Sequence, residues 1–125
     1  PPEQDRRTAR KILRAKTAYM SNAKWRKLFS ALHDLPGGCA AVEIKLVAHP
    51  NVVSVPTPGP HFEFEDHFGE CGSISFVPFS HIEFVRVLNA LITSSELIQH
   101  LNSFGKWPIT ELDEAILIHG YDWGE

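Results

Sequence analysis

The chain has 125 residues, of which 43% are hydrophobic, and a formal net charge of −3 at pH 7. A domain of this size buries roughly two thirds of the surface that its unfolded chain exposes, so its core needs no disulfide or metal. No apolar run reaches the roughly 20 residues of a membrane-spanning helix, and the first eleven residues match no secretory signal. Two cysteines, Cys39 and Cys71, are too few for a disulfide framework, so we expect a reduced, cytoplasmic protein.

The charged residues divide the chain into two parts. Residues 1–20 hold six bases and two acids, giving +4, and residues 21–125 hold six bases and thirteen acids, giving −7. In the first part the acids precede the bases, the order that a helix dipole favours, so we predict a basic helical lead over residues 1–20. Met20 is the only methionine and one candidate for the native start. Residues 21–125 are expected to form a single acidic α+β domain, which favours basic partners.

The first helix of this domain is predicted to begin at residue 21 or 22. Its apolar residues follow the i, i+3, i+4, i+7 spacing of an amphipathic helix: Trp25, Leu28, Phe29 and Leu32. Ser21 or Asn22 can cap its N-terminus, and the Leu-Pro-Gly-Gly sequence at residues 35–38 ends it.

A strand is predicted over residues 40–48, where three apolar residues alternate with Glu43 and Lys45. The four prolines of residues 50–60 indicate a loop with room for a short edge segment at residues 52–53. Residues 61–77 alternate apolar and polar side chains around a glycine-containing turn, which predicts a hairpin with one buried and one solvated face. The solvated face near the turn carries a dense group of acids: Glu63, Glu65, Asp66 and Glu70.

Residues 81–92 fit two structures. A capping box at residue 80 and helical apolar spacing allow a helix, whereas the β-branched and aromatic residues favour a third strand, which we prefer. A second capping box, Thr93 with Glu96, begins a helix that Gly105 ends. Residues 110–114 resemble a helical turn, and residues 115–121 a closing strand. The expected fold class is α+β, with a mainly antiparallel sheet of about four to five strands and two to three helices packed on it.

The hairpin also carries the chemistry of a metal site. His61, Glu63, Glu65 and His67 offer nitrogen and oxygen donors, which makes a metal-assisted hydrolase the alternative function. Their spacing matches no metalloprotease, paired-cysteine or calcium-loop motif, so a solvated polar turn explains them equally well. Cys71 lies near His67, but sequence proximity alone provides neither the contact nor the third group that activates a nucleophile. We therefore assign no catalytic residue and expect no metal and no cofactor.

The basic lead provides a second alternative, a nucleic-acid accessory. Six bases lie on its predicted helix: Arg6, Arg7, Arg10, Lys11, Arg14 and Lys16. Aromatic residues are sparse there, and the −7 charge of the following residues repels a phosphate backbone. Nucleic-acid binding is therefore the less favoured interpretation.

The favoured function is a module that binds a basic protein partner without catalysis. In this hypothesis Glu63, Glu65, Asp66 and Glu70 steer the partner, because charges at the rim of an interface mainly raise the association rate. Trp123, in the aromatic group near the end of the sequence, is the candidate anchor, since tryptophan is favoured at interfaces. The oligomeric state stays open.

The order of these segments resembles that of small bacterial families with no assigned function. The shared pattern comprises residues 25–29 (Trp-Arg-Lys-Leu-Phe), the aromatic and acidic strand with its glycine turn, residues 78–85 and residues 116–121. Several such families are suspected immunity proteins, which neutralise toxins by binding them. The similarity spans most of residues 21–125 and consists of apolar spacing. It implies a non-enzymatic acidic binder and supplies no catalytic residues.

Overall fold

The computed structural model describes residues 2–35, 39, 41–57, 67, 77–88 and 92–124. In chain order its elements are α1 (Pro2–Ile12), β1 (Thr17–Ala18), α2 (Asn22–His33), β2 (Ala41–Leu46), β3 (Val52–Pro56), the 3-10 helix η2 (Phe79–His81), β4 (Ile82–Leu88), α3 (Ser94–Asn102), β5 (Ile109–Glu111), β6 (Ala115–His119) and β7 (Tyr121–Asp122).

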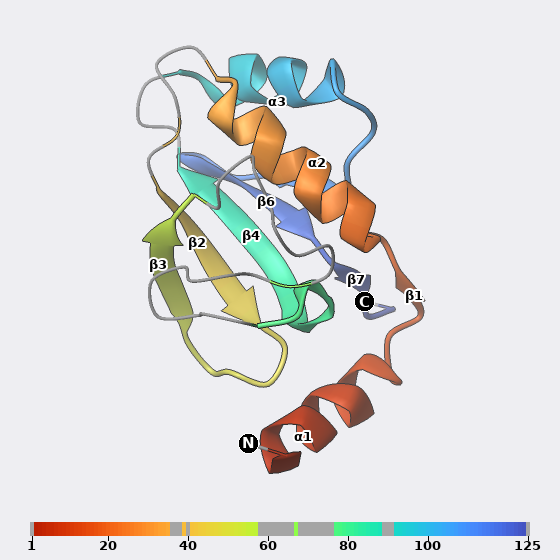
Figure 1. Ribbon diagram of the computed structural model, residues 1–125. Helices are drawn as coiled ribbons and strands as arrows, with labels where there is room; N and C mark the ends of the chain where they lie inside the picture. The colour runs from red at the N-terminus through yellow and green to blue at the C-terminus, as the bar shows by residue number, and fades with distance from the viewer. Residues whose placement is uncertain are drawn as a thin grey trace.

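Within the described residues, five strands form one antiparallel sheet in the order β3-β2-β4-β6-β5, and β1 pairs with β7 in a separate two-stranded sheet. Helix α2 runs across one face of the larger sheet, and α3 lies beside α2 (Figure 1). Alternate strand residues face the helices, so the core contains side chains from both layers. The predicted α+β class with a mainly antiparallel sheet is therefore confirmed.

Helix α2 buries an aromatic row against the sheet. Ser21, one of the two predicted caps, accepts a hydrogen bond from the backbone N–H of Lys24 at 3.1 Å. The rings of Trp25 and Phe29 stack with centroids 6.1 Å apart, and the centroid of Phe29 lies 6.0 Å from that of Phe79 in η2. All three side chains are almost completely buried, which places the predicted apolar face of the helix in the core.

Helix α3 begins at the predicted capping box. The side chain of Thr93 accepts a hydrogen bond from the backbone N–H of Glu96, and the Glu96 carboxylate accepts one from the N–H of Thr93. Nε2 of His100 lies 2.8 Å from the carbonyl oxygen of Ala31, so a hydrogen bond joins α3 to the end of α2. The two helices thus cover the sheet as one layer.

Strands β2 and β4 form the central pair of the sheet. In β2, Val42 and Ile44 are buried and Glu43 is half-buried on the other face, as the alternation of the sequence predicts. Residues 82–88 form a strand, so the helical alternative for them is wrong. The reason is that β4 lies between β2 and β6 in the sheet, and each of these strands pairs with one edge of its backbone. Strand β3 is longer than the expected segment 52–53, because all of Val52–Pro56 pairs with β2.

The helical turn predicted over residues 110–114 is wrong. Residues 109–111 form the edge strand β5, whose partners in β6 are Ile118, Leu117 and Ile116 in that order. The acidic sequence favours a helix locally, but the exposed backbone edge of β6 offers hydrogen-bond partners that a single helical turn lacks. Tertiary pairing therefore decides the structure of this segment.

The predicted hairpin of residues 61–77 lies almost entirely outside the described residues. Two of its members are described, His67 and Val77. His67 forms an antiparallel bridge with Pro78, immediately before η2.

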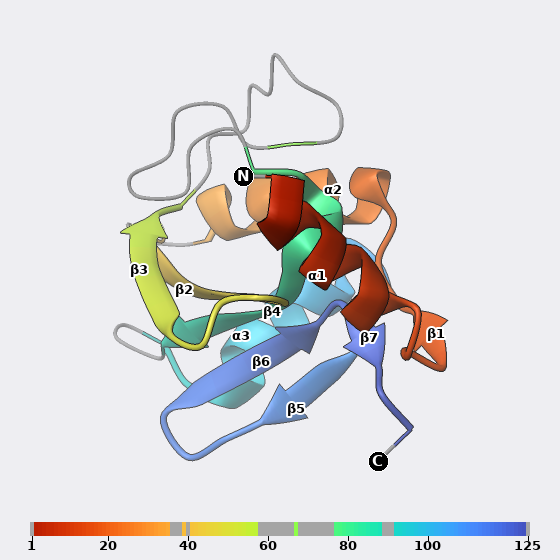
Figure 2. The same ribbon diagram turned by 90° about the horizontal axis from the view of Figure 1, so that it is seen from below.

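Helix α1 and strand β1 connect the basic lead to the body of the fold. Thr8 of α1 is buried, and Nζ of Lys11 donates a hydrogen bond to the carbonyl oxygen of Val47 at 3.1 Å. Farther along, Thr17 and Ala18 pair with β7, and the N–H of Tyr19 donates to the carbonyl oxygen of Gly120 at 2.9 Å. These contacts hold α1 at the end of the molecule opposite α3 (Figures 1 and 2).

Among the helices in the described ranges, none combines the length and the apolar character that crossing a membrane requires.

Gly120 lies between the end of β6 and the start of β7, and its close packing predicts that a larger residue there destabilises the fold. A β-carbon at this position would overlap the carbonyl oxygen of Ile82 and lie 3.3 Å from Cζ2 of Trp25. The Gly120→Ala variant should lower the free energy of unfolding by about 1–3 kcal/mol, the usual cost of overpacking. Urea unfolding followed by tryptophan fluorescence measures this.

The matched control for that variant is Gly124→Ala. Gly124 has a φ of 83°, which disfavours any other residue, but its β-carbon would meet no atom within 4 Å. The control therefore carries only the backbone cost of a left-handed L-residue, roughly 1–2 kcal/mol, with no steric overlap. A Gly120→Ala variant that is as stable as the wild type would contradict the predicted overlap at Gly120.

Candidate functional site

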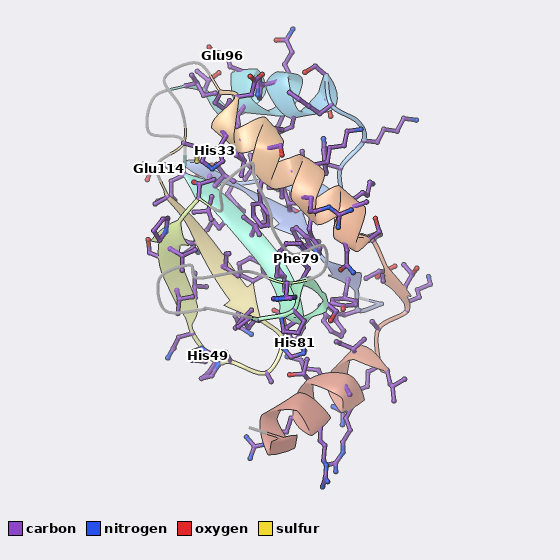
Figure 3. All side chains as sticks on the ribbon, viewed as in Figure 1. His33, His49, Phe79, His81, Glu96 and Glu114 are labelled. Carbon is purple, nitrogen blue, oxygen red and sulfur yellow. The ribbon has the colours of Figure 1, made fainter. Side chains whose placement is uncertain are left out.

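A shallow depression of about 1040 Å³ lies at the end of the molecule formed by the start of α3 and the turn between β5 and β6. We call it the acidic groove; it is lined by Leu88, residues 92–96 and residues 111–114. Figure 3 shows two of its acids, Glu96 on α3 and Glu114 before β6, at the end opposite α1. The groove is broad and open to solvent, a shape that suits a protein surface better than an enclosed small molecule.

Among the described residues that line the acidic groove there is no basic side chain, and there are four carboxylates: Glu96, Glu111, Asp113 and Glu114. The capping box fixes one of them, because Oε1 of Glu96 accepts a hydrogen bond from the hydroxyl of Thr93 at 3.0 Å. The other three follow each other around the β5–β6 turn. Within the described part of the chain, no ion pair involves any of these three acids. Judged from the described residues, these three carboxylates are therefore exposed to solvent without an ion-pair partner.

Two leucines add exposed apolar surface to the groove. The side chain of Leu88, at the end of β4, is 56% exposed, and that of Leu112, in the β5–β6 turn, is 42% exposed. Most other large apolar side chains of the described residues are buried or half-buried. Exposed leucines beside acidic side chains have the composition of an interface, which combines apolar and polar groups.

The sheet face opposite the helices carries a second set of polar groups. Nε of Arg86 donates a hydrogen bond to Oε1 of Glu43 at 2.7 Å, and this contact raises the pKa of Arg86. Beside them, Oγ1 of Thr110 lies 2.8 Å from Nε2 of His119. Burial lowers the pKa of His119, and the negative charge of Glu83 partly offsets this effect. The histidine is thus a neutral hydrogen-bonding partner near neutral pH.

A smaller hollow of about 310 Å³ lies between α1 and the residues that follow β2. Arg7, Lys11, Lys45 and His49 contribute to its lining. Oε1 of Glu83 forms ion pairs with Nζ of Lys11 at 3.3 Å and with Nζ of Lys45 at 3.6 Å. Both lysines therefore offset the charge of Glu83, whose side chain is largely buried, and the ion pair with Lys11 attaches α1 to the sheet.

The residues that the sequence suggested for partner binding are only partly described. Glu63, Glu65, Asp66 and Glu70 lie outside the described residues. Trp123 is half-buried, with its ring centroid 5.3 Å from that of Tyr121 and 5.7 Å from Nζ of Lys11. The indole therefore already contacts α1 within the same chain.

The alternative metal site also lies mostly outside the description. His61, Glu63 and Glu65 are among the residues that the structure does not describe, whereas His67 is described. In the described ranges, no group of three or more histidines, cysteines and acids is arranged to hold a metal ion. This finding concerns those ranges alone, and the hydrolase hypothesis stays a prediction.

Sequence reasoning missed the acidic groove. Leu88, Glu96 and Leu112 come from three separate segments, and residues 110–114 were expected to be helical. The one local signal was the sequence Glu-Leu-Asp-Glu at residues 111–114, where a leucine stands alone among acids.

The lowered pKa of His119 leads to a prediction about pH. The unfolded state takes up a proton near pH 6.5, the ordinary value of histidine, while the folded state resists protonation at that pH. The contribution of His119 is therefore complete above pH 6.5 and is lost as the pH falls toward the lowered value. Between about pH 7.5 and 5, the free energy of unfolding should fall less in His119→Gln than in the wild type. An equal fall in both proteins, in urea titrations at each pH, would contradict the assignment.

The chain was compared with known proteins in three ways. No protein-family model matches it, and neither a curated protein nor a solved structure is significantly similar to it. The resemblance to small immunity-type families therefore stays a prediction, and any function has to be argued from the residues themselves.

Proposed function

We propose that this chain is a non-enzymatic protein-binding module and that its acidic groove binds a basic protein partner. The proposal rests on the presence of two exposed leucines and four carboxylates in one open depression whose described lining includes no basic residue. The leucines supply affinity and the carboxylates supply preference for a positively charged partner.

The exposed leucines set the scale of the apolar contribution. Full burial of a leucine side chain is worth about 1.5–3 kcal/mol, so covering the exposed halves of Leu88 and Leu112 contributes roughly 2 kcal/mol together. That is too little for tight binding by itself. A partner must add contacts of its own, and the charges provide the most direct ones.

The carboxylates act mainly on the approach of the partner. Uncompensated charges of one sign attract an oppositely charged surface over about one Debye length, roughly 8 Å at physiological salt. They raise the association rate more than they slow dissociation. Glu63, Glu65, Asp66 and Glu70, proposed from the sequence, would extend the same negative field toward the partner.

An inhibitory role is the finer form of this proposal. The resemblance to suspected immunity proteins implies a partner that is itself an active protein, such as a toxin, which the module neutralises by covering it. The acidic groove supports this idea, because enzymes that act on nucleic acids present basic surfaces to the phosphate backbone.

The experiment begins with affinity capture from the native host and identification of the retained protein. The purified partner is then tested against wild type and the Glu111→Gln, Glu114→Gln double variant in stopped-flow association. The variant should associate about tenfold more slowly at low salt, and the difference should disappear at high salt. Leu112→Ala should instead accelerate dissociation, because it removes apolar contact.

A control with the same change in net charge separates the groove from the overall charge. Asn51, immediately before β3, and Ser54, within β3, are both exposed. Strand β3 is the edge of the sheet opposite β5. The Asn51→Lys, Ser54→Lys variant also adds two positive charges, and lysine is well tolerated at a sheet edge. If this control slows association as much as the groove variant, or if the groove variant binds like wild type, the groove is not the binding surface.

A further inference from the structure

The outer face of α1 is opposite in charge to the acidic groove, and both surfaces include exposed leucine. The face is formed by Arg6 and Arg10 of α1 and by Leu13 and Arg14 of the turn that directly follows it, at the i, i+4, i+7, i+8 spacing of a helix face, and all four are exposed. Leu13 is 84% exposed, more than Leu88, Leu112 or Tyr19. The helix thus presents one leucine among arginines, while the groove presents two leucines among carboxylates.

The inner face of α1 is already used within the chain. Thr8 is buried, and Lys11 binds both Glu83 and the carbonyl oxygen of Val47. These contacts fix the helix before any partner arrives, so docking its outer face does not require a segment to fold. The basic face is held outward as a preformed recognition element.

The two surfaces lie at opposite ends of the molecule. Helix α1 is at the bottom of Figure 1 and nearest the viewer in Figure 2, whereas the groove is formed by the start of α3 and the β5–β6 turn at the top of Figure 1. One copy therefore cannot place its α1 in its own groove. If these two complementary surfaces bind each other, they must belong to separate copies of the chain.

We infer that the acidic groove of one copy binds the Arg6–Leu13 face of α1 in a second copy, head to tail. Leu13 covers Leu88 and Leu112, while the arginines pair with the acids of the β5–β6 turn. Such a contact is heterologous, so each added copy leaves one groove and one helix open for the next. This inference rests on the proposed function in using the same groove, and it makes self-association a competitor of the basic partner.

The test uses two variants of the whole chain. The groove variant carries Glu111→Gln, Leu112→Ser and Glu114→Gln, and the helix variant carries Arg6→Gln, Arg10→Gln and Leu13→Ser. Every changed side chain is exposed, and circular dichroism checks that both variants keep the fold.

Sedimentation velocity measures their association over a series of protein concentrations. The wild type should grow beyond dimers as concentration rises at about 0.01 M salt, where the Debye length is about 30 Å. It should return to monomers at about 1 M salt, where that length is about 3 Å. Each variant alone should stay monomeric. An equimolar mixture should form one-to-one dimers and nothing larger, because it retains a single working pair of surfaces.

Several outcomes would overturn the inference. They are a wild type that stays monomeric at low salt, a variant that associates like wild type, and a mixture that remains monomeric. A gel shift of nucleic acid that depends on Arg6 and Arg10, without self-association, would assign the helix face to a phosphate backbone instead.

The same variants distinguish this inference from the proposed function. A monomeric wild type whose captured partner is lost only in the groove variant would refute self-association and leave the function standing. Self-association together with undiminished partner capture by the groove variant would refute the function and leave the head-to-tail contact standing.

Discussion

The contact between Trp25 and Gly120 is the packing constraint on which the arrangement of this chain depends. The indole belongs to the buried face of α2, and Gly120 lies where the chain leaves β6. A β-carbon at residue 120 would overlap the backbone of β4, so the close approach of these elements requires glycine. The N–H of Gly120 donates to Glu83 and its carbonyl accepts from Tyr19, which joins β4, the end of β6 and the residue after β1. From there β7 pairs with β1, and α1 is held at that end of the molecule.

Other contacts fix the end of the molecule that carries the acidic groove. The capping box of Thr93 and Glu96 fixes the start of α3, and the pairing of β5 with β6 fixes the acids of residues 111–114. Neither feature involves α1, so the positive and negative surfaces are built independently and face away from each other. We propose that both surfaces bind other molecules.

Much of the fold follows from local patterns in the sequence. The apolar spacing from Trp25 to Leu32, the Thr93–Glu96 capping box and the alternation around Val42 and Ile44 each depend on near neighbours in the chain, and the structure confirms all three. The helical turn predicted for residues 110–114 is wrong because the backbone of β6, several residues away, offers a pairing that the local sequence does not reveal. The acidic groove could not be predicted for the same reason. Its leucines and acids come from β4, α3 and the β5–β6 turn, and only the sheet order brings them together.

We propose that the acidic groove is the surface through which this chain binds a basic partner. Amide hydrogen exchange of the whole chain, with and without the captured partner, tests it most directly. Protection should increase at residues 92–96 and 111–114 and change little around Glu43, Arg86 and His119 on the opposite face of the sheet. Protection confined to that sheet face, with the groove unchanged, would contradict it.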